Sequence, residues 1–227
     1  MTKDKTKKYN PRDAVCPAHL SSTGTTQKYV LPAQTSGTYK AFTSSHWLSR
    51  TYGTYLKRSA QSIAAKFSQL DLDRSGKLTP QELVPVFSMG SGYIVPLRTV
   101  EKLARMFDYG DSKGLITFQE FAALDAYVTS LRNAFCACDR EKTGSISFQE
   151  VESCFRVQGF KLSEFLLQSL KIGWDREKTG RISYISYMDM AATLGLCRTV
   201  LNQFDPRRTG KIRLNFDELV ICMLGFK

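Results

Sequence analysis

The sequence predicts an all-α domain built from five repeated helix–loop–helix units and preceded by a basic tail. Three observations support this fold class. The chain has 227 residues, of which 42% are hydrophobic, and this is enough to bury a core. A loop rich in oxygen-bearing side chains returns along the chain at nearly regular intervals. Apolar residues between these loops recur every three or four positions, the period of an amphipathic helix.

The N-terminal part of the chain differs in composition from the rest. Residues 1–60 carry ten Lys or Arg against two Asp, a net charge of +8, and 17 Ser or Thr without apolar periodicity. Residues 61–227 carry 22 basic and 19 acidic groups, a net charge of only +3. A polar, basic segment buries too little apolar surface to offset its ordering entropy. We therefore predict a tail over residues 1–55, disordered or ordered only on a partner, and a folded domain over residues 56–227.

The first loop of the domain, loop 1, places oxygen ligands at regular positions. Asp71, Asp73 and Ser75 occupy positions 1, 3 and 5, Lys77 offers its main-chain carbonyl at position 7, and Glu82 ends the loop at position 12. Glycine at position 6 permits the sharp turn. This is the pattern of a twelve-residue EF-hand loop, because Ca²⁺ takes about six to eight oxygen ligands and the last Glu supplies two of them. The sequence therefore predicts a calcium site at loop 1.

The same pattern returns at loop 3, which covers residues 139–150. Acids again occupy positions 1, 3 and 12, glycine occupies position 6, and an aliphatic residue occupies position 8. The ligands expected here are Asp139, Glu141, Thr143, Ser145 and Glu150. We predict a second calcium site at loop 3.

Three further loops keep the turn but depart from the ligand pattern. Loop 4 (175–186) ends in Ser186, and loop 5 (205–216) ends in Phe216, where a bidentate acid is required. Loop 2 (108–120) is one residue too long for its glycine and its closing acid to fit together. We expect these loops to be structural, and calcium to bind at loops 1 and 3 only.

The spacing of the loops predicts how the helices are arranged. The loops start at Asp71, Asp108, Asp139, Asp175 and Asp205, so the successive differences in residue number are 37, 31, 36 and 30. The short intervals leave room for one continuous helix shared by two consecutive hands, and the long ones leave room for two helices and a turn. The hands are expected near residues 56–90, 97–121, 125–158, 161–188 and 190–227, with a shared helix from about Phe118 to Cys138.

Position 8 of each loop predicts short β contacts between paired loops. Leu78 is expected to pair with Ile116 and Ile146 with Ile182, which leaves Ile212 of hand 5 without a partner. The helix that follows Ile212 is apolar around most of its circumference. We predict that two chains pair through hand 5, by the residues Ile212, Phe216, Leu219, Val220 and Met223. The alternative is that the tail folds back and covers this surface.

Taken together, these features resemble the penta-EF-hand family. The resemblance covers about residues 56–227 and rests on five loops, their alternating spacing, and an acid displaced one or two places beyond Ile212, as a two-residue insertion in hand 5 would give. It implies an EF-hand superhelical array and calcium at hands 1 and 3. Pairing through hand 5, as a homodimer or with a related five-handed chain, is predicted from the partnerless Ile212 and not from the resemblance. The tail departs from the Gly/Pro-rich tails of the family, so the resemblance implies nothing about its role.

No enzyme is visible in the sequence, because neither a phosphate-binding loop nor a Ser/His/Asp or Cys/His arrangement occurs. The family role implies a cytoplasmic calcium sensor or adaptor that binds partner proteins. An alternative is a structural component of a cytoskeletal assembly such as a microtubule or axonemal lattice, which the net charge of +11 favours. A third reading, the regulatory subunit of a calpain-like protease, follows from the family alone.

The tail is expected to act as an electrostatic anchor. Its cationic residues alternate with single aromatic rings, a composition that suits docking to an acidic cytoskeletal lattice or an anionic membrane. These rings are Tyr9, Tyr29, Tyr39, Phe42, Trp47, Tyr52 and Tyr55. Nucleic acid is not favoured, since no recognised binding module accompanies the charge. Neither a signal peptide nor a long apolar segment is evident.

Overall fold

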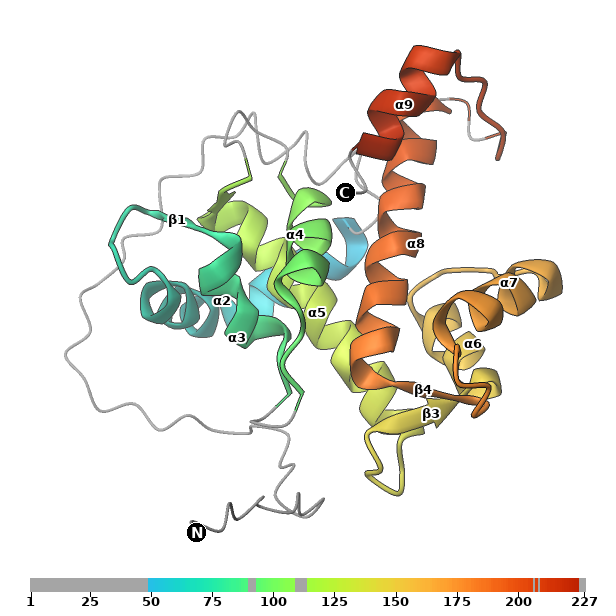
Figure 1. The fold of residues 1–227 in the computed structure, drawn as a ribbon. Helices are drawn as coiled ribbons and strands as arrows, with labels where there is room; N and C mark the ends of the chain where they lie inside the picture. Colours follow the sequence, from blue (N-terminus) through green and yellow to red (C-terminus); the bar gives the residue numbers. More distant parts are fainter. Residues whose placement is uncertain (1–48, 90–92, 109–113, 206, 208, 225–227) are drawn as a thin grey trace, which may run out of the picture.

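A computed structural model describes residues 49–89, 93–108, 114–205, 207 and 209–224, and confirms the all-α fold class. The helices and the loops between them form successive helix–loop–helix units (Figure 1). They are α2 (Ser49–Leu70), α3 (Pro80–Phe87), α4 (Leu97–Arg105), α5 (Phe118–Cys138), α6 (Phe148–Val157), α7 (Glu164–Trp174), α8 (Tyr184–Phe204) and α9 (Phe216–Leu224). None of the helices in the described ranges is long and apolar enough to cross a membrane.

The two helices predicted to be shared between hands are continuous. Helix α5 serves as the exit of hand 2 and the entry of hand 3, with the bounds that the sequence predicted, and α8 joins hands 4 and 5 in the same way. In Figure 1, α5 lies in the middle of the molecule, with α3 on one side of it and α8 on the other. The alternation of long and short loop intervals thus corresponds to separate and shared helices.

Short antiparallel strands join the loops in pairs, as expected. Strand β1 (Lys77–Leu78) pairs with β2 (Ile116–Thr117), so that Leu78 faces Ile116. Strand β3 (Ser145–Ser147) pairs with β4 (Arg181–Ser183), so that Ile146 faces Ile182. All four of these aliphatic side chains are at most 1% exposed, so each pair anchors its loops to the core.

The exit helices begin where the loops supply a cap. Thr79, Thr117 and Ser147 are the N-caps of α3, α5 and α6, and each forms a reciprocal capping box with the Glu three residues later. Position 9 and position 12 of an EF-hand loop therefore also form the start of the next helix. This dual use places the closing carboxylate of the loop on the first turn of the exit helix.

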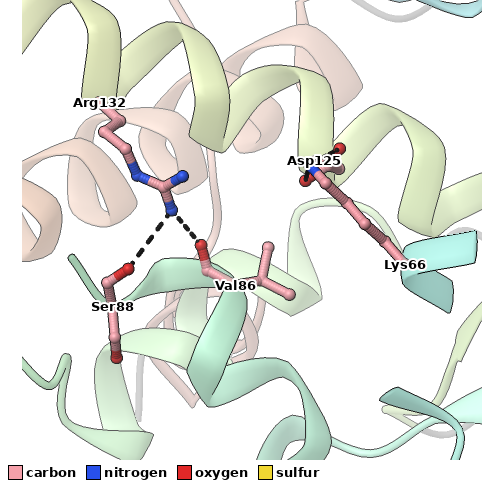
Figure 2. A network of polar contacts seen from close by, with 5 residues as sticks. All are labelled: Lys66, Val86, Ser88, Asp125 and Arg132. Atoms are coloured by element: carbon pink, nitrogen blue, oxygen red, sulfur yellow. Dashed lines mark hydrogen bonds and ion pairs between the residues drawn. The ribbon is translucent and has the colours of Figure 1, made fainter. Parts of the chain in front are cut away.

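Helix α5 is tied by polar contacts to both helices of hand 1 (Figure 2). Asp125, only 2% exposed, forms an ion pair with Lys66 of α2 at 3.2 Å. Arg132, further along α5, donates to the carbonyl of Val86 and, at 3.5 Å, to that of Ser88 at the end of α3. The last carbonyls of a helix lack partners within it, so Arg132 acts as a C-cap supplied by another helix.

Helix α2 extends into the segment that the sequence predicts as a tail. Helix α2 begins at Ser49, so residues 49–55 are helical, while the boundary between tail and domain near residue 56 stays a prediction. A helix that is already nucleated extends at little cost through polar residues, and these carry no apolar periodicity that could have revealed it. The rest of the predicted tail, residues 1–48, lies outside the described residues.

Candidate metal centre

Loop 1 brings three carboxylates together. Asp71, which directly follows α2, Asp73 and Glu82 offer oxygen atoms that all lie within 4.8 Å of one another. Asp71 is 4% exposed, and its two oxygens accept from the N–H groups of Ser75 at 2.9 Å and Gly76 at 3.0 Å. These hydrogen bonds hold the first carboxylate of the loop in one orientation.

The other ligands predicted in loop 1 are held in the same small volume. The Ser75 N–H also donates to Asp73 at 2.9 Å, and the Ser75 hydroxyl donates to the Lys77 carbonyl at 2.9 Å. Hydrogen bonds from the Ser75 hydroxyl and N–H lower the pKa of Asp73, so this carboxyl is held in its charged form. Glu82 accepts from Leu72 N–H at 3.1 Å with one oxygen and from Thr79 N–H at 2.8 Å with the other. A set of hard oxygens with three negative charges fits Ca²⁺.

Loop 3 has the same backbone path but a looser set of acids. Asp139 accepts from the N–H groups of Thr143 at 2.8 Å and Gly144 at 2.7 Å, as Asp71 does in loop 1. Glu141 is exposed, and the acids of loop 3 do not form a group as close as that of loop 1 within the described residues. The N–H and hydroxyl of Ser147, and more weakly the charges of Arg181 and Arg140, lower the pKa of Glu150. Glu150 is therefore held in its charged form, while the three acids of loop 3 lie further apart than those of loop 1.

The remaining loops keep the turn for structural reasons. In loop 4, Asp175 accepts from the N–H of Gly180 at 2.8 Å, but Ser186 at position 12 hydrogen-bonds to Ser183 instead of closing a carboxylate shell. In loop 2, Gly114 N–H reaches Asp108 at 2.7 Å across one extra residue, and residues 109–113 lie outside the described part of the chain. These first-position acids serve the turn itself.

Loop 5 contains the insertion that the sequence indicated. Glu218 accepts from the N–H of Asn215 at 2.9 Å, and the side chain of Asn215 accepts from the N–H of Glu218 at 2.9 Å. This reciprocal pair is the one that positions 9 and 12 form in loop 1, but in loop 5 it lies at positions 11 and 14. The acid is therefore displaced by two residues, and the aliphatic Ile212 lies outside the strands of the described chain.

Comparison with known proteins agrees with this architecture. An EF-hand domain pair model matches residues 60–124. Penta-EF hand domain-containing protein 2 of Dictyostelium discoideum is 28% identical over 173 residues, 76% of this chain and 82% of that protein. Sorcin of Schistosoma japonicum is 29% identical over 154 residues, 68% of this chain and 89% of that protein. A solved structure of a homolog of programmed cell death 6 protein from Leishmania major superposes with a TM-score of 0.54 and 29% identity, covering 73% of this chain and 90% of that chain.

The chain is similar to proteins of the penta-EF-hand family over 68–76% of its length. With an EF-hand pair matched over residues 60–124, it is an EF-hand protein of the calcium-binding type. This similarity agrees with the five loops, the two strand pairs and the shifted acid of hand 5.

One residue close to the candidate ligands of this EF-hand domain was not found from the sequence. Arg181, at position 7 of loop 4, reaches across the strand pair and donates to the Ser145 carbonyl at 2.7 Å and to the Thr143 hydroxyl at 3.0 Å. Both acceptors are predicted ligands of loop 3. The signal was available in the pairing of loops 3 and 4, because position 7 of one loop lies opposite position 9 of the other.

The turn glycines of loops 3 and 4 give a matched test of packing at this centre. Gly144 and Gly180 have φ of 75° and 72°, a conformation that costs any L-residue roughly 1–2 kcal/mol. A methyl group at Gly144 would collide with the ring of Tyr93, whereas nothing lies within 4 Å of one at Gly180. We expect Gly144→Ala to lower the free energy of unfolding by about 1–3 kcal/mol more than Gly180→Ala.

Urea denaturation of both variants without calcium measures this difference. It should disappear when Tyr93→Ala is added to each. Equal losses in the two single variants would contradict the packing of Tyr93 on loop 3.

Proposed function

We propose that the protein is a calcium sensor and adaptor that binds calcium at loops 1 and 3 and, when loaded, binds partner proteins. The observation that supports this most directly is the group formed by Asp71, Asp73 and Glu82, with ligand atoms within 4.8 Å of one another. Loop 3 carries the same ligand types on the same backbone turn. Three acids per loop suit sensor-like dissociation constants of roughly 10⁻⁷ to 10⁻⁵ M.

The geometry of loop 1 provides a way for calcium binding to change the relative position of α2 and α3. Asp71 directly follows the entry helix α2, whereas Glu82 lies in the first turn of the exit helix α3. Asp71 and Glu82 would both hold a bound calcium ion, which would supply a double positive charge. Because Glu82 is also the capping partner of Thr79, any shift of its carboxylate moves the start of α3 relative to α2. Arg132 and Lys66 connect these two helices to α5, so a change in hand 1 is passed to hand 3.

A second candidate is a structural role in an acidic cytoskeletal assembly. The observation that favours it is the net charge of +11, most of which lies within residues 1–60. In this case calcium would stabilise the domain without controlling partner binding, and residues 1–48 would supply the contact with the lattice or with an anionic membrane. A regulatory subunit of a calpain-like protease is supported by the similarity to the family alone.

The proposal includes a dimer formed through hand 5. Four apolar side chains of α9 are exposed: Phe216 by 78%, Leu219 by 48%, Val220 by 38% and Met223 by 59%. Figure 1 places α9 at the C-terminal end of α8. Contiguous apolar surface of this kind is typical of an interface, and a two-fold contact would bury the same residues on both chains.

Affinity capture from cell extract with and without calcium separates the two candidates. The sensor role predicts partners that bind in calcium and are released by a chelator. The Glu82→Gln plus Glu150→Gln variant is the control, since it keeps the capping hydrogen bonds but loses the closing charges, and it should capture none of these partners. Retention in a cytoskeletal pellet that is the same with calcium, with chelator and in the control variant would favour the structural role and overturn the sensor.

A further inference from the structure

The guanidinium group of Arg181 hydrogen-bonds to atoms of loop 3 that are predicted to bind calcium. Arg181, in strand β4 of loop 4, donates three hydrogen bonds to loop 3. Its Nε donates to the Ser145 hydroxyl at 2.8 Å, and one Nη donates to the Ser145 carbonyl at 2.7 Å and to the Thr143 hydroxyl at 3.0 Å. The carbonyl and the Thr143 oxygen are the ligands expected at positions 7 and 5. Arg181 and a calcium ion at loop 3 would therefore compete for the same oxygen lone pairs.

Both loops have a hydrogen bond from the position-5 hydroxyl to the position-7 carbonyl, at 2.9 Å from Ser75 to Lys77 in loop 1 and at 3.0 Å from Thr143 to Ser145 in loop 3. In loop 3 the guanidinium group of Arg181 adds a further hydrogen bond to that carbonyl from the paired loop. The residue of loop 2 that corresponds to Arg181 is Leu115, which directly follows the turn glycine and has no side-chain donor. Because the two strand pairs have the same register, the difference between the loops comes from this one position.

We propose that Arg181 is a built-in cation that competes with calcium at loop 3, so that loop 3 binds more weakly than loop 1 and loads after it. This inference rests on the proposed calcium binding at loop 3. A guanidinium group stays charged at any physiological pH, so its competition does not depend on protonation. It satisfies the Ser145 carbonyl in the calcium-free state and repels a divalent ion at close range.

The same contact joins loop 3 to loop 4. Calcium at loop 3 would weaken or break the three hydrogen bonds of Arg181, which belongs to the strand that leads directly into α8. Loop 4 has lost its own closing acid, with Ser186 at that position, yet it supplies the residue that sets the affinity of its neighbour. Arg181 is exposed, so solvent screens its charge and we expect an effect on the order of tenfold, the equivalent of one charge-assisted hydrogen bond.

The test uses the full chain with loop 1 silenced by Glu82→Gln. Calorimetric calcium titration should give about tenfold tighter binding when Arg181→Gln is added. Arg181→Lys keeps the positive charge but loses the planar guanidinium group with its several donors. Its calcium affinity should lie between those of the Glu82→Gln parent and of the protein with Arg181→Gln. Arg176→Gln removes the same charge from an exposed position of loop 4 and should change the affinity by less than about threefold. In a Glu150→Gln protein, in which loop 1 is expected to be the remaining calcium site, adding Arg181→Gln should not change the calcium affinity.

Thermal unfolding supplies a readout that does not need bound calcium. Without calcium, Arg181→Gln should lower the melting temperature, because three hydrogen bonds between the loops are lost, and calcium should then raise it by more than in the parent. Equal calcium affinities of the Glu82→Gln protein with and without Arg181→Gln would overturn the inference and leave the proposed function standing. Absence of calcium binding in both would overturn calcium binding at loop 3 and the inference with it. If Arg181→Gln does not fold, the comparison with Arg181→Lys decides.

Discussion

Glu82→Gln is expected to weaken calcium binding at loop 1 by at least about 100-fold, beyond the 10–100-fold typical for a residue that only supports a ligand. Glu82 is the closing acid of the loop, and its two oxygens supply both a charge and a bidentate ligand. Asp71 and Asp73 remain, but the group of three carboxylates within 4.8 Å becomes a group of two. The fold should survive, because Gln keeps an oxygen that can accept from the N–H of Thr79.

Calorimetry on the wild type and on Glu82→Gln measures this loss, with Glu164→Gln as the control. Glu164 is an exposed acid in the first turn of α7, outside every loop, so its removal changes the net charge by the same amount. The double variant Glu82→Gln plus Glu150→Gln should bind no calcium in the micromolar range. Tight binding that persists in the double variant would show that the ligand assignment is wrong for at least one of the two loops.

The fold could be predicted from the sequence because its determinants are local. The loop pattern fixes where each helix ends and the next begins, since position 1 follows an entry helix and position 12 lies in the first turn of an exit helix. The bounds of α5 and the two strand pairs centred on Leu78 and Ile146 follow from this periodicity. The start of α2 at Ser49 does not, because no apolar repeat or cap marks it in the sequence.

The candidate site could be predicted only as far as it is local. Loops 1 and 3 have equal ligand counts in the sequence, but in the structure their surroundings differ. Asp73 is held by Ser75 near Glu82, whereas in loop 3 Arg181 reaches in from the neighbouring loop. The ring of Tyr93 against Gly144 and the cap that Arg132 gives to α3 are likewise contacts between distant segments. A pattern within one loop carries no information about such contacts.

The exposed face of α9 leads to the second large effect. Leu219→Asp plus Met223→Asp is expected to convert the dimer into a monomer, because the two residues lie one helical turn apart and each would place a charge in a buried apolar contact. Both side chains are largely exposed in the single chain, so the charges should not disturb the folded protomer. Light scattering coupled to gel filtration reports the mass directly, and circular dichroism checks that the protomer stays folded.

The matched control for this interface is Phe165→Asp plus Ile172→Asp on α7. These residues are 83% and 80% exposed, so the control introduces the same two charges on another apolar helix face. It should leave the mass of the proposed dimer unchanged, because α9 and Ile212, which lies outside the strands of the described residues, belong to hand 5, whereas loops 1 to 4 already have strand partners. A control that dissociates the dimer while the α9 variant does not would move the interface to α7. A wild-type chain that is monomeric at tens of micromolar would exclude the homodimer and leave two explanations, a related five-handed chain as the partner of hand 5 or the tail as the cover of α9.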